Sequence, residues 1–238
     1  MTILKHLVRP LRILRGDPLC PLCGNRAQAF FPFGVDARPG AQCPTCKSLE
    51  RHRLLWLYLK RETALFATVD QKIVHIAPIP GEAAVSEQLD RHFSENYISG
   101  DIEPGKAKRV LDLTALDIED SSVDLLICNH VLEHILDDRT ALSEIYRVLR
   151  PGGQAILMVP IRTEVTFEDP SITSEEERLR VFGQQDHVRN CGNDYYDRYR
   201  DAGFAVDLVQ PDTYVSASEI RGMNLAAHEI PVCRKPSL

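Results

Sequence analysis

The sequence has no apolar run near the roughly 20 residues that a membrane-spanning helix needs, and it shows no secretory signal peptide. It also has no surplus of positive charge. Its 28 Lys and Arg against 34 Asp and Glu give a net charge of −6, which argues against a protein that binds mainly nucleic-acid phosphates. Internal repeats are absent, and 44% hydrophobic with 26% charged residues excludes a disordered, collagen-like or coiled-coil chain. We therefore expect a soluble, cytoplasmic globular protein, with 238 residues forming one large domain or one domain with a small annex.

Seven cysteines are present, an odd number that fits a disulfide framework poorly. Four of them form two C-x-x-C pairs, Cys20 with Cys23 and Cys43 with Cys46, with residues 24–42 between the pairs. Two thiolates on one tight turn can fill two corners of a tetrahedron, and a second such turn closes it. The spacing predicts a structural zinc site, while two disulfides or four metal-free thiols are the alternatives. The isolated Cys128, Cys191 and Cys233 need no partner.

The chain divides into segments of different composition and hydrophobic pattern. Residues 1–16 are apolar with interspersed Lys and Arg, which predicts a helix packed on the protein or, alternatively, lying on a membrane surface. Residues 17–50 form the zinc-ribbon module, and an apolar face in residues 51–69 predicts a linker helix. Residues 70–238 form the main domain, within which the polar residues 161–190 are expected to be an inserted lid or substrate loop.

Strands and helices alternate from residue 70 onward. Predicted strands cover residues 72–77, 96–101, 109–113, 123–129, 154–160, 203–209 and 228–235, and predicted helices cover 82–92 and 138–149. This alternation predicts an α/β fold of the Rossmann-like type, with helices on both faces of a mostly parallel sheet. Only a loop separates the last two strands, which favours an antiparallel edge strand.

Polar residues follow the carboxyl ends of the first four strands, where open α/β sheets bind their ligands. These are the loop 77–81, Asp101, the pair Asp112-Leu113, and the pair Asn129-His130. Asp101 comes 20 residues after Gly81, a spacing typical of a carboxylate that accepts both hydroxyls of a ribose.

The segment NHVLEHILDDRTALSEIYRVLRPGGQAILMVP, residues 129–160, resembles the second half of a class I S-adenosylmethionine-dependent methyltransferase of the small-molecule, ubiquinone-biosynthesis-like type. The preceding LDLTALDIEDSSVDLLICN fits the same family. The resemblance covers residues 72–160 and extends more loosely through the last two strands. A bacterial subgroup with a double C-x-x-C front end is similar also in His187-Val188-Arg189 and Ala202-Gly203-Phe204.

The resemblance implies a role for each strand-end residue in binding S-adenosylmethionine. The loop with Ala77, Pro78 and Gly81 would pass beneath the methionine part of the cofactor. Asp101 would hold the ribose, and Asp112 would accept from the adenine amino group with Leu113 beside the ring. Asn129 and His130 would line the methionine and methyl end.

The loop 77–81 differs in one respect from the methyltransferase family that the chain resembles. Of three glycines usual at positions 77, 79 and 81, only Gly81 remains. Because Ile79 is β-branched and resists positive φ, we predict another path for this loop, fixed by Pro78 and Pro80.

Two other functions remain open, the first of them because two glycines are missing from the loop 77–81. One is a cofactor-free fold whose zinc ribbon binds RNA or protein, with Arg51, His52, Arg53 and Trp56 as the candidate surface. The other is an NAD-type oxidoreductase, which the missing G-x-G-x-x-G disfavours.

Methyl transfer is a direct displacement, so the enzyme aligns the acceptor and excludes water, and it needs a base only for a protonated acceptor. Candidate bases are His134 and His187. Arg162 and Arg189 could bind an anionic group of a small-molecule acceptor, or form ordinary salt bridges. Tyr195 is a further candidate for substrate binding, with core packing as its alternative.

Overall fold

The computed structural model describes residues 17–34, 37–226 and 228–237. The helix expected over residues 1–16 lies outside the described residues. None of the helices in the described ranges is long and apolar enough to span a bilayer.

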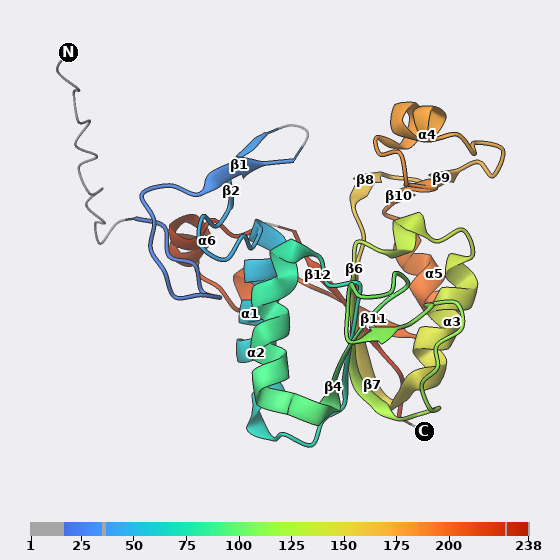
Figure 1. Cartoon of the computed structure of the whole chain (residues 1–238), viewed down its shortest axis with the longest axis horizontal. Coiled ribbons are helices and arrows are strands. Elements are labelled where there is room, and N and C mark those ends of the chain that lie inside the picture. Colours follow the sequence, from blue (N-terminus) through green and yellow to red (C-terminus); the bar gives the residue numbers. More distant parts are fainter. Residues whose placement is uncertain (1–16, 35–36, 227, 238) are drawn as a thin grey trace, which may run out of the picture.

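A seven-stranded sheet forms the centre of the molecule (Figure 1). Its strands, in spatial order, are β11 (Ala205–Val209), β12 (Ile230–Arg234), β7 (Leu149–Met158), β6 (Val123–Asn129), β3 (Ile73–Ile76), β4 (Tyr97–Asp101) and β5 (Arg109–Val110). β12 pairs antiparallel with both neighbours, and the pairs from β7 to β5 are parallel. The mostly parallel Rossmann-like sheet is thus confirmed. The antiparallel strand lies one place in from the edge, because β12 inserts between β7 and β11.

Helices cover both faces of this sheet because its strands send alternate apolar side chains to opposite sides. One face packs on α1 (Glu50–Arg61), α2 (Ala83–Phe93) and α6 (Ala217–Met223), and the other on α3 (Asp138–Val148) and α5 (Tyr195–Asp201). Within β3, Ile73 belongs to the first core and Val74 to the second. Figure 1 shows α1 and α2 on one side of the sheet and α3 and α5 on the other.

The N-terminal module packs directly on the main domain. It contains the hairpin of β1 (Phe31–Phe33) and β2 (Arg38–Gln42) and two cysteine turns, and Cys20, Leu22, Phe30 and Cys43 share one core with α1 and the sheet. The buried guanidinium of Arg53 in α1 donates to the carbonyls of Ala41, Ser48, Met223 and Asn224. One side chain therefore joins the module, the helix and the segment after α6.

Residues 161–192 fold into a small unit of their own. Its sheet has the order β8 (Ile161–Thr163), β10 (Arg189–Gly192), β9 (Phe167–Glu168), and α4 (Glu175–Phe182) lies between β9 and β10 in the chain. Ser174 caps α4 by accepting from the backbone N–H of Glu177. The segment expected to be an inserted lid or substrate loop thus contains a three-stranded sheet and one helix.

Candidate functional site

The strand-end residues predicted to bind cofactor lie in line along one edge of the sheet. Ile76 pairs with Gly100 on one side and Cys128 on the other, and Asp101 pairs with Val110. Ala77, Asp101 and Asn129 are consequently at the same level of three strands, and Asp112 follows at the end of β5. Along the order β5-β4-β3-β6, the sequence on this edge is Asp112, Asp101, Ala77 and Asn129.

The loop after β3 takes its turn at Ala77. This residue has a φ of 44°, and its N–H donates to Gly100 O at 2.6 Å. Ile79, between Pro78 and Pro80, is extended at φ −68° and ψ 163°, and a 3-10 turn (Pro80–Glu82) leads into α2. Ile79 therefore needs no left-handed backbone, in agreement with the path predicted from its β-branched side chain.

The close packing of α1 on the loop after β3 requires glycine at position 81. A Cβ at this position would lie 2.8 Å from Cε1 of His52, and Nδ1 of His52 is 2.9 Å from Gly81 O. His52 is completely buried, and this burial lowers its pKa to about 4. The glycine retained in the first loop thus allows α1 to approach that loop.

A buried polar pair lies where β3 and β6 end. Nδ2 of Asn129 donates to Oε1 of Glu82 at 2.6 Å, and Nε2 of His75 is 3.7 Å from the same oxygen. Burial raises the pKa of Glu82, whereas the imidazole of His75 and the amide of Asn129 lower it, and the balance is a pKa of about 2. The other two oxygens, Glu82 Oε2 and Asn129 Oδ1, are buried and accept no hydrogen bond from the described residues.

Unpaired buried acceptors of this kind are costly unless a donor reaches them. A cationic amino group, such as that of the methionine part of S-adenosylmethionine, is such a donor, so these residues fit the cofactor. Sequence reasoning missed Glu82, which directly follows Gly81 and was assigned only to a helix.

The two acidic residues predicted for ribose and adenine both accept from their own turns. Oδ1 of Asp101 accepts from Glu103 N at 2.8 Å. Oδ1 of Asp112 accepts from the hydroxyl and the N–H of Thr114, which lowers the pKa of this exposed carboxyl. Leu113 is buried beside it. Their local contacts hold both carboxylates in fixed positions.

The two candidate bases lie together although 52 residues separate them. The rings of His134 and His187 have centroids 4.7 Å apart and are nearly perpendicular at 82°. His134 belongs to the 3-10 turn Leu132–His134 after β6, and His187 precedes β10. Burial lowers the pKa of His187, which favours the neutral imidazole at neutral pH.

Two more residues complete this group. Glu133 is 1% exposed, and its Oε1 is 3.3 Å from Nδ1 of His130, which has a φ of 56°. Glu133 was not predicted from sequence, since a single acid in a Leu-Glu-His segment gives no sign of its burial.

Arg189 makes its contacts within the protein, as the salt-bridge alternative to a substrate contact predicted. Its guanidinium is buried, and it donates to Glu168 and to the carbonyls of Leu132, Ile135 and Leu136. These partners occupy the donors that a substrate anion would need, so Arg189 joins β10 to the turn after β6.

Tyr195 and Arg162 likewise form contacts within the protein. The hydroxyl of the buried Tyr195 donates to Asp138 at 2.6 Å, so the tyrosine lies in the core, which was the alternative to substrate binding. Arg162 is exposed in β8 and donates to Phe182 O at 3.2 Å.

A cavity of about 430 Å³ opens beside His130. The residues around it come from β2, α1, the ends of β6 and β7, α5 and the start of β12, and they are Arg38, Glu50, Arg51, His130, Met158, Val159, Pro160, Ile161, Tyr196, Leu225, Ala226, His228, Glu229 and Pro231. Nε of Arg51 is buried without a hydrogen-bond partner among the described residues. The N-terminal module therefore forms one wall of a cavity at the carboxyl edge of the sheet.

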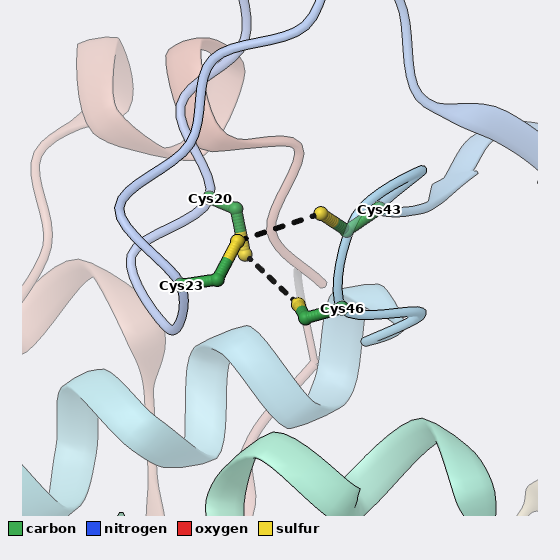
Figure 2. Close-up of side chains that lie close together, drawn as sticks. All are labelled: Cys20, Cys23, Cys43 and Cys46. Atoms are coloured by element: carbon green, nitrogen blue, oxygen red, sulfur yellow. Dashed lines mark hydrogen bonds between the residues drawn. The ribbon is translucent and has the colours of Figure 1, made fainter.

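The four cysteines of the C-x-x-C pairs converge, as Figure 2 shows. Their sulfurs lie within 4.8 Å of one another, with 3.6 Å between Cys20 and Cys46 and 3.9 Å between Cys23 and Cys43. A tetrahedron of thiolates around zinc has edges of about 3.8 Å, whereas a disulfide would need about 2.05 Å. The donor set fits one zinc ion, and all seven cysteines are free of disulfides.

Three of the four residues of the candidate RNA-binding surface are buried. His52 and Arg53 are fully buried, and Trp56 is buried against Phe66. Stacking of bases needs accessible aromatic rings, so this observation removes the support for the RNA-binding alternative.

Comparisons with known proteins agree with the fold. Residues 79–157 match the family described as a methyltransferase domain. An uncharacterised 37.1 kDa protein of transposon Tn4556 from Streptomyces fradiae is 34% identical over 127 residues, which are 52% of this chain and 35% of that protein. A protein of Mycolicibacterium smegmatis described as a probable S-adenosylmethionine-dependent methyltransferase is 37% identical over 76 residues, 32% of this chain and 26% of that protein. The chain thus spans about a third or less of these relatives.

Among solved structures, a chain from the complex between the Haloferax volcanii Trm112 methyltransferase activator and its methyltransferase superposes with a TM-score of 0.50. The two chains are 14% identical, and the match covers 79% of this chain and 90% of that one. The sheet order and this superposition together show the Rossmann-like fold, and the match to the methyltransferase-domain family covers residues 79–157.

Proposed function

We propose that this protein transfers the methyl group of S-adenosylmethionine to a small-molecule metabolite by direct displacement. The observation that carries the proposal is the alignment of Asp112, Asp101, Ala77 and Asn129 along one sheet edge, within and beside the segment that matches the methyltransferase domain. An extended nucleoside with an amino-acid tail needs its partners in this order.

The residues of this edge bind and orient the cofactor, which supplies the electrophilic methyl group. Asp101 accepts from the ribose hydroxyls and Asp112 from the adenine amino group, with Leu113 beside the ring. The loop at Ala77, Pro78 and Gly81 supports the methionine part. Asn129 and Glu82 accept from its amino group with the two oxygens that the described residues leave unpaired.

The methyl acceptor binds in the cavity next to His130. Its volume of about 430 Å³ suits a small molecule, because typical ligand pockets run from about 300 to 1,000 Å³. His134 or His187 takes the proton of an acceptor that is protonated at neutral pH. The net charge of −6 further favours a metabolite over a nucleic acid as acceptor.

The four cysteines hold a structural zinc ion in the same proposal. All four corners of the tetrahedron are thiolates, which leaves no position open for a substrate. Hydroxyl Oγ of Ser48 lies 3.1 Å from Cys46 Sγ and 3.5 Å from Cys20 Sγ, where it can donate to a metal-bound sulfur. Metal analysis should find this zinc in the wild-type protein and not in Cys43→Ser.

Calorimetric titration with S-adenosylhomocysteine tests the cofactor assignment. We expect the wild-type chain to bind it, and Asp101→Ala to weaken binding by about tenfold, the scale of a lost charged hydrogen bond. Glu103→Ala is the matched control, because this exposed acid lies two residues away and donates to Asp101 only through its backbone. Unchanged affinity in Asp101→Ala, or binding of NADH without S-adenosylhomocysteine, would contradict the proposal.

A further inference from the structure

Three side chains form a group with metal-binding geometry, and one of them, Glu133, contacts His130 of the cavity wall. The carboxylate of Glu133 and the imidazoles of His134 and His187 each offer a ligand atom, and these atoms all lie within 4.8 Å of one another. They come from two segments distant in sequence, the 3-10 turn after β6 and the segment that leads into β10. The group is separate from the four cysteines of the zinc module.

Glu133 supplies a second, independent observation. It is 1% exposed, and its Oε2 is buried without a hydrogen-bond partner among the described residues. Leaving a carboxylate oxygen unpaired away from water costs free energy of a few kcal/mol, so such an oxygen ordinarily has a partner. A cation between Glu133, His134 and His187 provides one.

Contacts around the group hold its members in place. Nδ1 of His134 is 3.3 Å from Oδ2 of Asp186, which leaves Nε2 as the nitrogen available to an ion. This carboxylate–imidazole arrangement is the usual support of a metal-bound histidine. The N–H of Val188 donates to Glu133 O at 3.0 Å, and Arg189 donates to Leu132 O, so the two ligand-bearing segments are fixed to each other.

From this geometry we propose that Glu133, His134 and His187 bind one divalent cation of the first transition series or zinc. Two imidazoles and one carboxylate on one side of an ion are typical of sites that keep further positions open. His130 extends the site toward the cavity, since its Nδ1 is 3.3 Å from Glu133 Oε1 and it lines the cavity wall.

The open positions give the cation a use in the reaction. A hydroxyl of the acceptor bound to the ion would have a lower pKa and would release its proton to solvent water, so its oxygen could bond to the methyl carbon as the bond from that carbon to sulfur breaks and S-adenosylhomocysteine leaves. His134 and His187 would then act as ligands in place of a role as base. This use rests on the proposed methyl transfer, whereas binding of the ion does not. The acceptor is thus expected to carry an oxygen, such as a hydroxyl group, that can reach the metal.

Titration of the full-length protein with Mn²⁺ and with Zn²⁺ tests the site. We expect one equivalent of Mn²⁺ to bind, seen by calorimetry and by loss of the free Mn²⁺ resonance signal. After saturation with Zn²⁺ and removal of unbound metal, wild-type protein should retain one more zinc per chain than Glu133→Gln. This variant keeps the size of the side chain and removes its charge, and it should weaken Mn²⁺ binding by at least about tenfold. His187→Gln should have the same effect.

Glu176→Gln is the matched control, because it makes the same change on the exposed surface of α4 and should bind metal as the wild type does. The proposal is overturned if the wild type binds neither ion beyond the cysteine site, or if Glu133→Gln retains as much metal as the wild type. Titration of each variant with S-adenosylhomocysteine separates the two proposals. Metal binding without S-adenosylhomocysteine binding would overturn the methyl transfer and leave the metal site standing.

Discussion

His52 joins α1 to the loop that follows β3. It lies in α1, its ring occupies the space that a side chain at position 81 would need, and its Nδ1 bonds to the cofactor loop at Gly81 O. No feature of the sequence RHRLLW distinguishes this histidine from its neighbours, because its burial results from the packing of α1 on a loop 29 residues away. In the RNA-binding alternative, the sequence predicted that His52 is exposed, whereas the packing of α1 on the loop after β3 buries it.

The buried state of His52 predicts how stability depends on pH. Its pKa is about 4 in the folded protein and about 6.5 in the unfolded chain, so the unfolded chain binds more protons between these values. The free energy of unfolding should therefore fall as the pH falls through this window. This contribution is about 2 kcal/mol from about pH 7.5 to about pH 5. Urea unfolding of wild type and His52→Gln measures it as the difference between their pH slopes.

The comparison removes effects common to both proteins, including protonation of the cysteine site. His92→Gln serves as the control for the loss of an imidazole elsewhere in the fold, because this residue lies at the end of α2, where its Nε2 contacts Thr68 O. Parallel pH profiles for wild type and His52→Gln would show that folding does not lower the pKa of His52.

Other residues of the site differ in how far the sequence revealed them. Asp101 and Asp112 could be placed because each follows an apolar strand, and strand ends define the ligand edge of a parallel sheet. Glu82 and Glu133 could not, because a carboxylate is ordinarily exposed and only tertiary packing buries it. For Arg189 the sequence left a substrate contact and a salt bridge open for the same reason: its partners are carbonyls of a turn more than 50 residues away.

At the scale of elements, the regular strands and helices were predictable and the small unit at 161–192 was not. β6 and α3 are seven and eleven residues long, with apolar residues at the strand and helix periods. β8, β9 and β10 have two to four residues each, too few for a period to appear. Their position depends instead on a network of charged side chains between this unit and the main sheet.

That network predicts that Arg189 stabilises the small unit. Its guanidinium is 3% exposed and bonds to Glu168 of β9 and to the turn after β6, while Arg198 bonds to the same Glu168 and to Asp138. Replacing Arg189 by Leu removes one donor from Glu168 and from the carbonyls of the turn after β6, and loss of one partner of a buried pair costs about 3 kcal/mol. Urea unfolding should show this loss, and limited proteolysis should cut within residues 161–192.

Arg162→Leu is the matched control in the same unit, because Arg162 is exposed and makes one hydrogen bond to Phe182 O. Its effect should stay within about 0.5 kcal/mol. A loss below about 1 kcal/mol for Arg189→Leu would mean that solvent replaces its contacts.

At the scale of the whole molecule, the predicted division into a small annex and a main domain describes the order of the segments along the chain but not how they pack together. The order of segments was predictable, since the cysteine spacing and the change to alternating strands mark the boundary. How the segments join was not, because the join consists of buried contacts such as those of Arg53. Cys20 and Cys43 share one apolar core with Leu54, Val85 and Ile127 of α1, α2 and β6.

This shared core predicts that removing zinc destabilises the entire chain. Without the ion, the zinc–sulfur bonds that join the two cysteine turns are lost. The apolar core that these turns share with α1 then becomes exposed to water. Scanning calorimetry of the protein treated with a strong chelator should show a single transition at a lower Tm than that of the metal-loaded protein. Added Zn²⁺ should restore the original Tm. Cys23→Ser, which removes one ligand from a half-buried position, should resemble the chelated protein and should not respond to Zn²⁺. An annex that folds by itself would instead give two transitions, with the main one unchanged by the chelator, and that result would show that the module only touches the sheet without sharing its core.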